Sequence, residues 1–241
     1  MEISNTNKTF GAERADVQRL VYGISHDMGA PLRAVVQLSS MLKERLGNRL
    51  DEREGYWLQL IEDSGLHAQK MIESLSIYSR LSTNRQQNRQ FKLKKVFEKV
   101  LLKLDAEIQQ SSAKITIDGE WPEYNGCEDQ WLMMVTCLIQ NALLYQPKDV
   151  GHVPLITVSC SQITENLRII IEDNGIGVRE NLWSVLTTPF KRLQSDSEYP
   201  GIGMGLTYCE RIAVLHCGTL EIGQSSLGGM AVSYIEKMES I

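Results

Sequence analysis

The stretch NLRIIIEDNGIGV, from Asn166 to Val178, joins a run of strand-forming residues to a glycine-rich turn. The run predicts a β-strand because β-branched side chains favour extended backbone. Asp173 ends this strand, where its carboxylate can accept a hydrogen bond from the exocyclic amine of a base. Gly175 and Gly177 let backbone amides approach a ligand closely or adopt positive φ. The stretch therefore predicts one edge of a ligand site.

A second glycine-rich stretch, GIGMGL, runs from Gly201 to Leu206 and opens the helical segment TYCERIAVLH. Free amides and the helix dipole at such an N-terminus favour phosphate. The spacing matches neither the Rossmann nor the P-loop pattern. Before it lie TTPFKRL, with Phe190 and Arg192, and the polar stretch QSDSEY, which is typical of a mobile lid over a nucleotide.

Asn141 lies in the apolar segment CLIQNALLYQP, which predicts a helix. An amide on an apolar helix needs a polar partner, and its carbonyl oxygen is a ligand that suits Mg²⁺. Further helices are predicted near 92–111, 128–145 and 204–216. The runs KITIDG, PLITVSCSQ, GTLEIG and MAVSYIEK predict strands. Strands mixed with helices without strict βαβ alternation favour an α+β sandwich.

The N-terminal third is helical in pattern. Residues 1–10 are polar and predicted to be loose, and a helix is expected from about Ala12 to Leu46, with Asp51 as the N-cap of a second helix. The second helix carries a seam at alternating spacings of four and three, formed by Trp57, Ile61, Ser64, Ala68, Met71, Leu75 and Tyr78. A helical hairpin alone buries too little, so we expect a second copy to complete a four-helix bundle. The alternative is a two-helix layer packed on the rest of the chain.

Composition narrows the classes of function. The net charge of −5 disfavours a nucleic-acid partner, and neither a membrane-spanning run nor a signal-peptide core is visible, so the chain is expected to be cytoplasmic. The five cysteines show no CxxC pair and predict reduced thiols rather than disulfides or a zinc site.

Asn141, DNGIG, PFKRL and GIGMGL, in that order, resemble the N, first glycine, F and second glycine boxes of the GHKL ATP-binding fold. SHDMGAPLR, from Ser25 to Arg33, resembles the H box of the sensor histidine kinases, and the lid region is most similar to the phytochrome-type subgroup. The resemblance implies a dimerisation and histidine phosphotransfer hairpin at 11–83 and an ATP-binding domain of α/β sandwich type at 92–241. Polar composition predicts the flexible N-terminus at 1–10 and a linker at 84–91.

The resemblance also implies roles for single residues. His26 would accept the γ-phosphate of ATP, with Asp27 as its general base, and Pro31 would bend the helix after the site. His26 lies off the seam of Ile24 and Met28, so we expect it to face solvent. Asn141 would coordinate Mg²⁺ and Asp173 would bind the adenine amine. The remaining implied nucleotide-binding residues are Tyr145, Gly175, Gly177, Phe190, Arg192, Gly201, Gly203, Gly205 and Leu206. Arg192 could reach phosphate or pair with a carboxylate, and Phe190 is expected to anchor the lid.

Three positions depart from the family pattern. Cys137 stands where a second asparagine is frequent, and Leu144 stands where a lysine is frequent, so ATP turnover is expected to be slow. Ala30 cannot orient a water as threonine or asparagine can, which predicts weak phosphatase activity toward the partner.

The expected function is an ATP-dependent histidine autokinase that passes phosphate to an aspartate on a response regulator receiver domain. Its signal would come from a sensor domain of a longer chain or from a separate sensor protein. The alternative is a weakly catalytic or non-catalytic phosphotransfer scaffold with a degenerate ATP site. A third possibility, an ATPase of the gyrase or chaperone kind, is disfavoured because such an enzyme needs no acceptor histidine.

Overall fold

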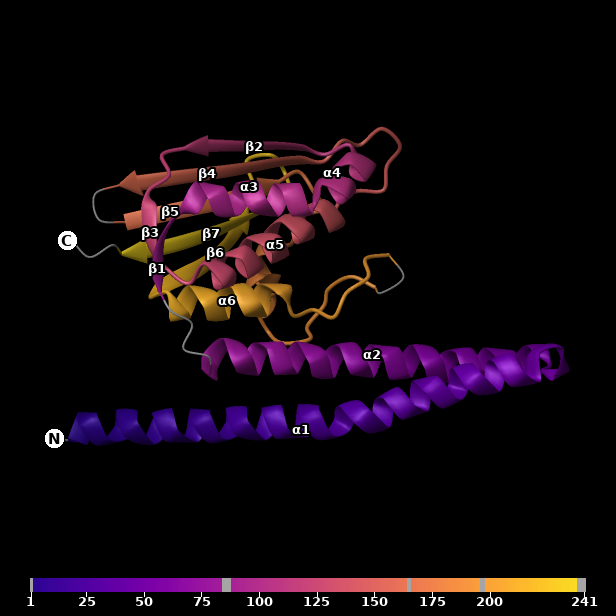
Figure 1. Cartoon of the computed structure of the whole chain (residues 1–241). Coiled ribbons are helices and arrows are strands. Elements are labelled where there is room, and N and C mark those ends of the chain that lie inside the picture. Colours follow the sequence, from indigo (N-terminus) through magenta and orange to yellow (C-terminus); the bar gives the residue numbers. More distant parts are fainter. Residues whose placement is uncertain (1, 84–87, 164–165, 196–197, 238–241) are drawn as a thin grey trace. The chain divides into compact units, whose positions relative to one another are not determined.

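A computed structural model of the chain describes residues 2–83, 88–163, 166–195 and 198–237 (Figure 1). Side chains are described over the same ranges except at 2–22, 26, 48, 82, 83 and 163. The chain divides into two compact units, Met1–Asn84 and Arg85–Ile241. None of the described helices has an apolar stretch that could cross a lipid bilayer.

The first unit is a helical hairpin of α1 (Glu2–Leu46) and α2 (Glu52–Thr83), joined through the short helix η1 (Gly47–Arg49). The helix α1 starts well before the expected position near Ala12 and so runs through most of the stretch 1–10. Residues 2–10 contain neither proline nor glycine, so nothing in this stretch interrupts the helical backbone. Pro31 lies inside α1, which changes direction along its length (Figure 1).

The start of α2 is closed by a reciprocal pair of hydrogen bonds. The Glu54 amide donates to Oδ1 of Asp51 at 2.7 Å, and the Asp51 amide donates to Oε2 of Glu54 at 2.9 Å. This is a capping box, and it satisfies two amides that the helix cannot pair internally. The predicted N-cap at Asp51 is confirmed.

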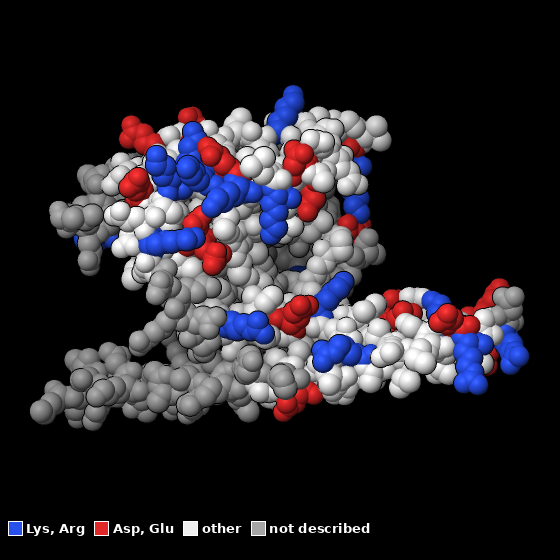
Figure 2. All heavy atoms as spheres, viewed as in Figure 1, with Lys and Arg blue, Asp and Glu red and all other residues white. Residues whose placement is uncertain are grey.

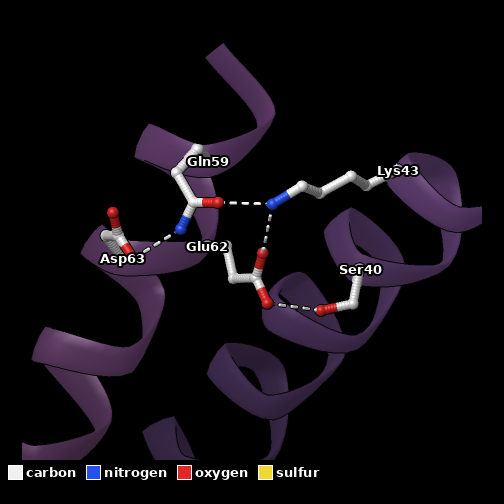
Figure 3. Close-up of polar contacts among 5 residues, drawn as sticks. All are labelled: Ser40, Lys43, Gln59, Glu62 and Asp63. Atoms are coloured by element: carbon white, nitrogen blue, oxygen red, sulfur yellow. Dashed lines mark hydrogen bonds and ion pairs between the residues drawn. The ribbon is translucent and has the colours of Figure 1, made fainter. Parts of the chain in front are cut away.

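Polar side chains connect the two helices near their turn (Figure 3). The Ser40 hydroxyl donates to Oε1 of Glu62 at 2.8 Å, and the Lys43 ammonium lies 3.9 Å from the other oxygen of Glu62. Lys43 also donates to the amide oxygen of Gln59, whose nitrogen donates to Asp63 at 2.9 Å. These contacts fix the register of α1 against α2.

Small residues line the contact between the helices. Gly65 is buried, and a Cβ added to it would lie 2.6 Å from Cγ2 of Val36. Ser39 and Ser79 are also buried. Apolar side chains at helical spacing on α1 and at the start of the α2 seam, in contrast, stay open in the single chain, whereas Met71, Leu75 and Tyr78 of the α2 seam are partly buried. Leu38 is 59% exposed, and the seam residues exposed to a comparable degree are Ile24, Met28, Val35, Leu42, Trp57 and Ile61.

The second unit is built on a five-stranded sheet of order β2-β4-β5-β7-β6. Its strands are β2 (Lys114–Gly119), β4 (Leu155–Ile163), β5 (Asn166–Asp173), β6 (Gly218–Gln224) and β7 (Met230–Lys237). The pair β2–β4 is parallel and the other pairs are antiparallel. A smaller sheet pairs β1 (Arg89–Lys92) with β3 (Glu123–Gly126).

Helices cover one face of the large sheet (Figure 1). They are α3 (Leu93–Lys103), α4 (Asp105–Ser111), α5 (Glu128–Leu144) and α6 (Gly205–Leu215), and the short helix η2 spans Glu180–Val185. Alternate residues of β5, including Leu167 and Ile169, point into this core, where Trp131 and Ile212 are fully buried. The α+β prediction is confirmed. The expected helix over 92–111 is divided at Leu104, and the sequence did not predict β1 or β3.

A polar cluster lies inside this core, and His216 is at its centre. Its Nδ1 is 3.1 Å from the hydroxyl of Tyr124, and its Nε2 is 2.9 Å from Oε1 of Gln130. The hydroxyls of Tyr124 and Tyr234 both donate to Glu236. Burial lowers the pKa of His216 to about 4. The residue is therefore a neutral part of the core.

We predict that the stability of the second unit falls as the pH drops from about 6.5 toward 4. The unfolded state takes up a proton on His216 below about pH 6.5, whereas the folded state does so only near pH 4. Between pH 7 and 4.5 this residue should contribute a loss of about 2–3 kcal/mol. Urea unfolding at both pH values, compared with His216→Gln, measures it. An equal loss in the variant would contradict the assignment.

Candidate functional site

Asp173 ends β5, and the residue is 7% exposed. Its Oδ1 accepts hydrogen bonds from the amides of Gly175 at 2.8 Å and Met230 at 3.1 Å. Burial raises the pKa of this carboxyl, and the two amides oppose that rise. Among the described residues no donor contacts Oδ2. That oxygen is therefore free to accept a hydrogen bond from an amine of a bound molecule.

Glycines allow the backbone to close around this carboxylate. A Cβ on Gly175 would lie 2.3 Å from the carbonyl oxygen of Tyr145 and 2.9 Å from Oδ1 of Asp173. A Cβ on Gly229, in the turn between β6 and β7, would lie 2.1 Å from the same Oδ1. Both distances are far inside van der Waals contact. The cradle around Asp173 thus exists only with glycine at these two positions.

The turn after Asp173 is held from several sides. Asn174 accepts a bond from the amide of Leu155 at 2.7 Å and donates to the carbonyl of Val153 at 3.0 Å, which ties the turn to the start of β4. Ile176 donates from its amide to the carbonyl of Tyr145 at 3.0 Å. Gly177 has a φ of 61°, a left-handed value that favours glycine. These bonds bring the end of α5 beside the end of β5.

Asn141, on the last turns of α5, faces the first residue of α6. A Cβ on Gly205 would be 3.7 Å from both polar atoms of the Asn141 side chain. The amides of the first turn of α6 have no carbonyl partner within the helix, so this end favours an anion. Leu206 packs into the core at 9% exposure. Asn141 and Gly205, both predicted as site residues, thus lie together. Gly201, also predicted, is not in such a contact, because a Cβ there would meet no atom within 4 Å.

The segment before α6 folds back on itself. Phe190 has a φ of 60° and donates from its amide to the carbonyl of Gly203 at 3.1 Å, and Gly203 has a φ of 77°. The Arg192 guanidinium donates to the carbonyl of Tyr199. That backbone partner is neither the phosphate nor the carboxylate considered from the sequence.

Tyr199 lies against the end of α5. Its ring centroid is 5.4 Å from that of Tyr145, with 33° between the ring planes, and its hydroxyl donates to the carbonyl of Gln146 at 3.1 Å. The ammonium of Lys148 is 5.2 Å from the Tyr199 ring centroid. Tyr199, which belongs to the stretch QSDSEY predicted as a lid, is therefore held beside Tyr145, whose carbonyl lies against the turn after Asp173.

The predicted acceptor His26 lies in α1 of the first unit, but its side chain is outside the described residues. Its solvent exposure therefore stays a prediction. The neighbouring Asp27 is exposed and Ser25 is buried. Ala30 is also exposed.

A metal at this site would have to share its coordination with a ligand. The described residues contain no group of three or more histidine, cysteine or carboxylate side chains that could hold a metal ion. The carbonyl oxygen of Asn141 is of the type that Mg²⁺ prefers, and this ion commonly keeps waters and phosphate oxygens as further ligands. Asn141 therefore suits a magnesium ion that also binds phosphate oxygens. The described residues do not supply the cluster of ligands that would hold a metal ion without a phosphate.

Sequence reasoning missed Gly229, Met230 and Tyr199. The pair Gly228–Gly229 between two predicted strands indicates a turn, but only the structure shows that this turn closes on Asp173. Tyr199 stands in a polar stretch whose pattern gives no sign of a ring contact with Tyr145.

Comparison with known families gives two matches in chain order. Residues 16–84 match the His Kinase A (phospho-acceptor) domain. Residues 126–237 match the histidine kinase-, DNA gyrase B- and HSP90-like ATPase family.

Similar proteins include cyanobacterial phytochrome A of Nostoc sp., which is 26% identical over 91% of this chain and 28% of that protein. The sensor histidine kinase CpxA of Escherichia coli is 28% identical over 88% of this chain and 45% of that protein. The chain thus spans less than half the length of either relative.

Solved structures show the same fold. Full-length ShkA in complex with AMPPNP has a TM-score of 0.65 and 16% identity, over 92% of this chain and 47% of that one. The Acinetobacter baumannii histidine kinase AdeS has a TM-score of 0.60 and 20% identity, over 87% of this chain and 96% of that one.

We predict that Gly229→Ala disrupts the site. The added methyl would collide with Oδ1 of Asp173, so stability should fall by about 1–3 kcal/mol and binding of a fluorescent ATP analogue should weaken at least tenfold. Gly223→Ala is the matched control, because a Cβ there meets no atom within 4 Å. Urea unfolding and fluorescence titration measure both variants. Equal behaviour of the two would contradict the role assigned to Gly229.

Proposed function

Since the chain belongs to the sensor histidine kinases and carries their phospho-acceptor and ATPase domains in that order, we propose that it phosphorylates itself on His26 with ATP. The phosphate then passes to an aspartate on the receiver domain of a response regulator. The observation that carries the proposal is the glycine-lined cradle around Asp173, which leaves one carboxylate oxygen open to a ligand. The same end of α5 that lies against this cradle through Tyr145 also brings Asn141 to the first residue of α6.

The nucleotide would be bound at two ends. Oδ2 of Asp173 accepts a hydrogen bond from the exocyclic amine of adenine, while the amides of Gly175 and Met230 hold the other oxygen in place. The first turn of α6 and the glycines at 201, 203 and 205 receive the phosphates. The AMPPNP complex of ShkA, whose fold this chain shares, supports a nucleotide in this domain.

In the transfer step, a ring nitrogen of neutral His26 uses its lone pair to attack the γ-phosphorus. A nitrogen–phosphorus bond forms as the bond to the bridging oxygen of ADP breaks. Asp27 accepts a hydrogen bond from the other ring nitrogen and stabilises the positive charge that develops on the ring. Asn141 contributes a ligand to Mg²⁺, which when bound neutralises charge on the phosphates.

The open seams of α1 and α2 support a homodimer. Apolar side chains as large as Leu38 and Trp57 are half exposed in the single chain, and they follow helical spacing. A second copy that packs its own seams on these would form a four-helix bundle. We place the protein in the cytoplasm, and we infer that its input comes from a sensor domain or a separate sensor protein.

One feature favours the alternative of a phosphotransfer scaffold with a degenerate ATP site. Cys137 and Leu144 lie on α5 on either side of Asn141, and neither offers an amide or a cation to a phosphate. We therefore expect slow autophosphorylation rather than none, because Asn141 and both glycine stretches remain.

Incubation with Mg²⁺ and γ-labelled ATP should place acid-labile label on the wild-type chain. His26→Gln should abolish the label, and His67→Gln should not, because His67 is an exposed histidine on α2 with no role in the proposal. Labelling that survives in His26→Gln would refute His26 as acceptor. No label on the wild type, together with binding of the ATP analogue, would favour the scaffold.

The dimer is tested on the α1 seam. Leu38→Glu should convert the dimer to a monomer in analytical ultracentrifugation, because a buried carboxylate without a partner is costly in an apolar bundle. Gln37→Glu adds the same charge at the exposed neighbouring position and should remain dimeric. If Leu38→Glu sediments as the wild type does, the seam is not the dimer interface.

A further inference from the structure

Two cysteines meet between α5 and α6, close to the proposed nucleotide site. The helices run antiparallel, with Asn141 beside Gly205 at one end and Gln130 bonded to His216 at the other. Between these points Cys137 and Cys209 lie opposite each other on the two helices.

Independent contacts fix the position of both cysteines. Cys209 donates its thiol proton to the carbonyl of Met134 at 3.7 Å, one turn before Cys137. The Cβ of Cys137 lies 3.8 Å from a Cβ built on Gly205, one turn before Cys209. Each cysteine therefore lies against the turn of the opposite helix that precedes its partner.

The two thiols differ in access. Cys137 is partly exposed, whereas Cys209 is fully buried. Of the two residues, Cys137 therefore lies nearer to solvent, and Cys209 lies behind it. An accessible thiol next to a second, shielded thiol is the arrangement of an attacking and a resolving cysteine.

The surroundings of Cys137 favour its thiolate. The neighbouring Cys209 thiol lowers the pKa of Cys137, and the positive charge of Lys103 lowers it further, against the effect of burial. Lys103 ends α3, and basic side chains gather over this helix (Figure 2). The exposed lysines there are Lys92, Lys94, Lys95, Lys99 and Lys103. Burial raises the pKa of Cys209.

We propose that Cys137 and Cys209 form an oxidisable dithiol that reacts with hydrogen peroxide and closes to a disulfide between α5 and α6. This site goes beyond the kinase proposal and does not depend on it, because the chemistry requires neither nucleotide nor His26.

The reaction proceeds in two balanced steps. The Cys137 thiolate attacks one peroxide oxygen, the oxygen–oxygen bond breaks, and the departing hydroxide takes a proton to become water. The resulting sulfenic acid on Cys137 is attacked by the Cys209 sulfur, which loses its proton, and the sulfenic oxygen leaves as a second water. In sum, two thiols lose two electrons and two protons, and one peroxide is reduced to two waters.

The disulfide would enclose the whole segment from α5 through the lid to α6. It would connect the turn that follows Gly205 to the turn that precedes Asn141. The first turn of α6 could then no longer move freely against Asn141. Oxidation thus acts on the same helix pair that lines the proposed phosphate end of the site.

The test uses the reduced full chain, treated with a small molar excess of hydrogen peroxide at pH 7.5. Remaining thiols are then blocked with N-ethylmaleimide. Digestion combines trypsin with a glutamate-specific protease, because Glu128 separates Cys127 from Cys137. Mass spectrometry without reductant should find the Cys137 and Cys209 peptides joined with the loss of two hydrogens, and dithiothreitol should separate them.

Variants make the result specific. Cys217→Ser removes the exposed cysteine outside the pair and should leave the cross-link unchanged. Cys209→Ala should abolish it and leave a sulfenic acid on Cys137 that dimedone traps. If circular dichroism shows that Cys209→Ala does not fold, the peptide masses of the wild-type chain decide the test by themselves. Recovery of Cys137 and Cys209 both blocked by N-ethylmaleimide, at a peroxide dose that oxidises Cys217, overturns the proposal, as does a cross-link from Cys137 to any other cysteine.

Discussion

The buried carboxylate of Asp173 is the constraint around which the second unit is arranged. Three separate segments meet on it: the end of β5, the turn that follows, and the turn between β6 and β7. Two amides satisfy Oδ1, and the main chain can come this close only because Gly175 and Gly229 lack side chains. A buried carboxylate is costly unless it is hydrogen-bonded, so the turns and the acid stabilise one another. Oδ2 remains available to a hydrogen-bond donor on a ligand, which would complete the hydrogen bonding of the carboxylate.

In the first unit the main constraint is instead the apolar surface that the hairpin leaves exposed to water. Its two helices touch through small residues such as Gly65 and Ser39, with polar bonds near the turn (Figure 3). This contact brings the backbones close but leaves large apolar side chains such as Leu38, Trp57 and Ile61 exposed. Association of two chains removes this surface from water, which provides the driving force for a bundle. The hairpin is therefore shaped for a partner rather than for independent stability.

Local patterns in the sequence predicted most elements because their causes are local. The N-cap at Asp51, the strand that ends at Asp173 and the helix that starts at Gly205 each have a short signal, and each lies where it was expected. The short strands β1 and β3 were missed because neither has a periodicity long enough to detect. Gly229 was missed as a site residue because its role depends on a contact with Asp173, more than fifty positions away. Long-range contacts of this kind leave no local pattern.

Cys137 illustrates how a departure from a family pattern can be interpreted in two ways. From the sequence, a cysteine in place of an asparagine on α5 indicates a weakened phosphate site. In the structure, Cys137 faces a second thiol on α6, with a lysine charge near it and Asn141 one turn further along. Random loss of a polar side chain would not explain a matching thiol on the opposite helix. We expect cysteine at this position to lower phosphate affinity, and the same residue places a thiol opposite Cys209 on α6. The proposed sensitivity to oxidation and the expected slow turnover would then have the same structural origin.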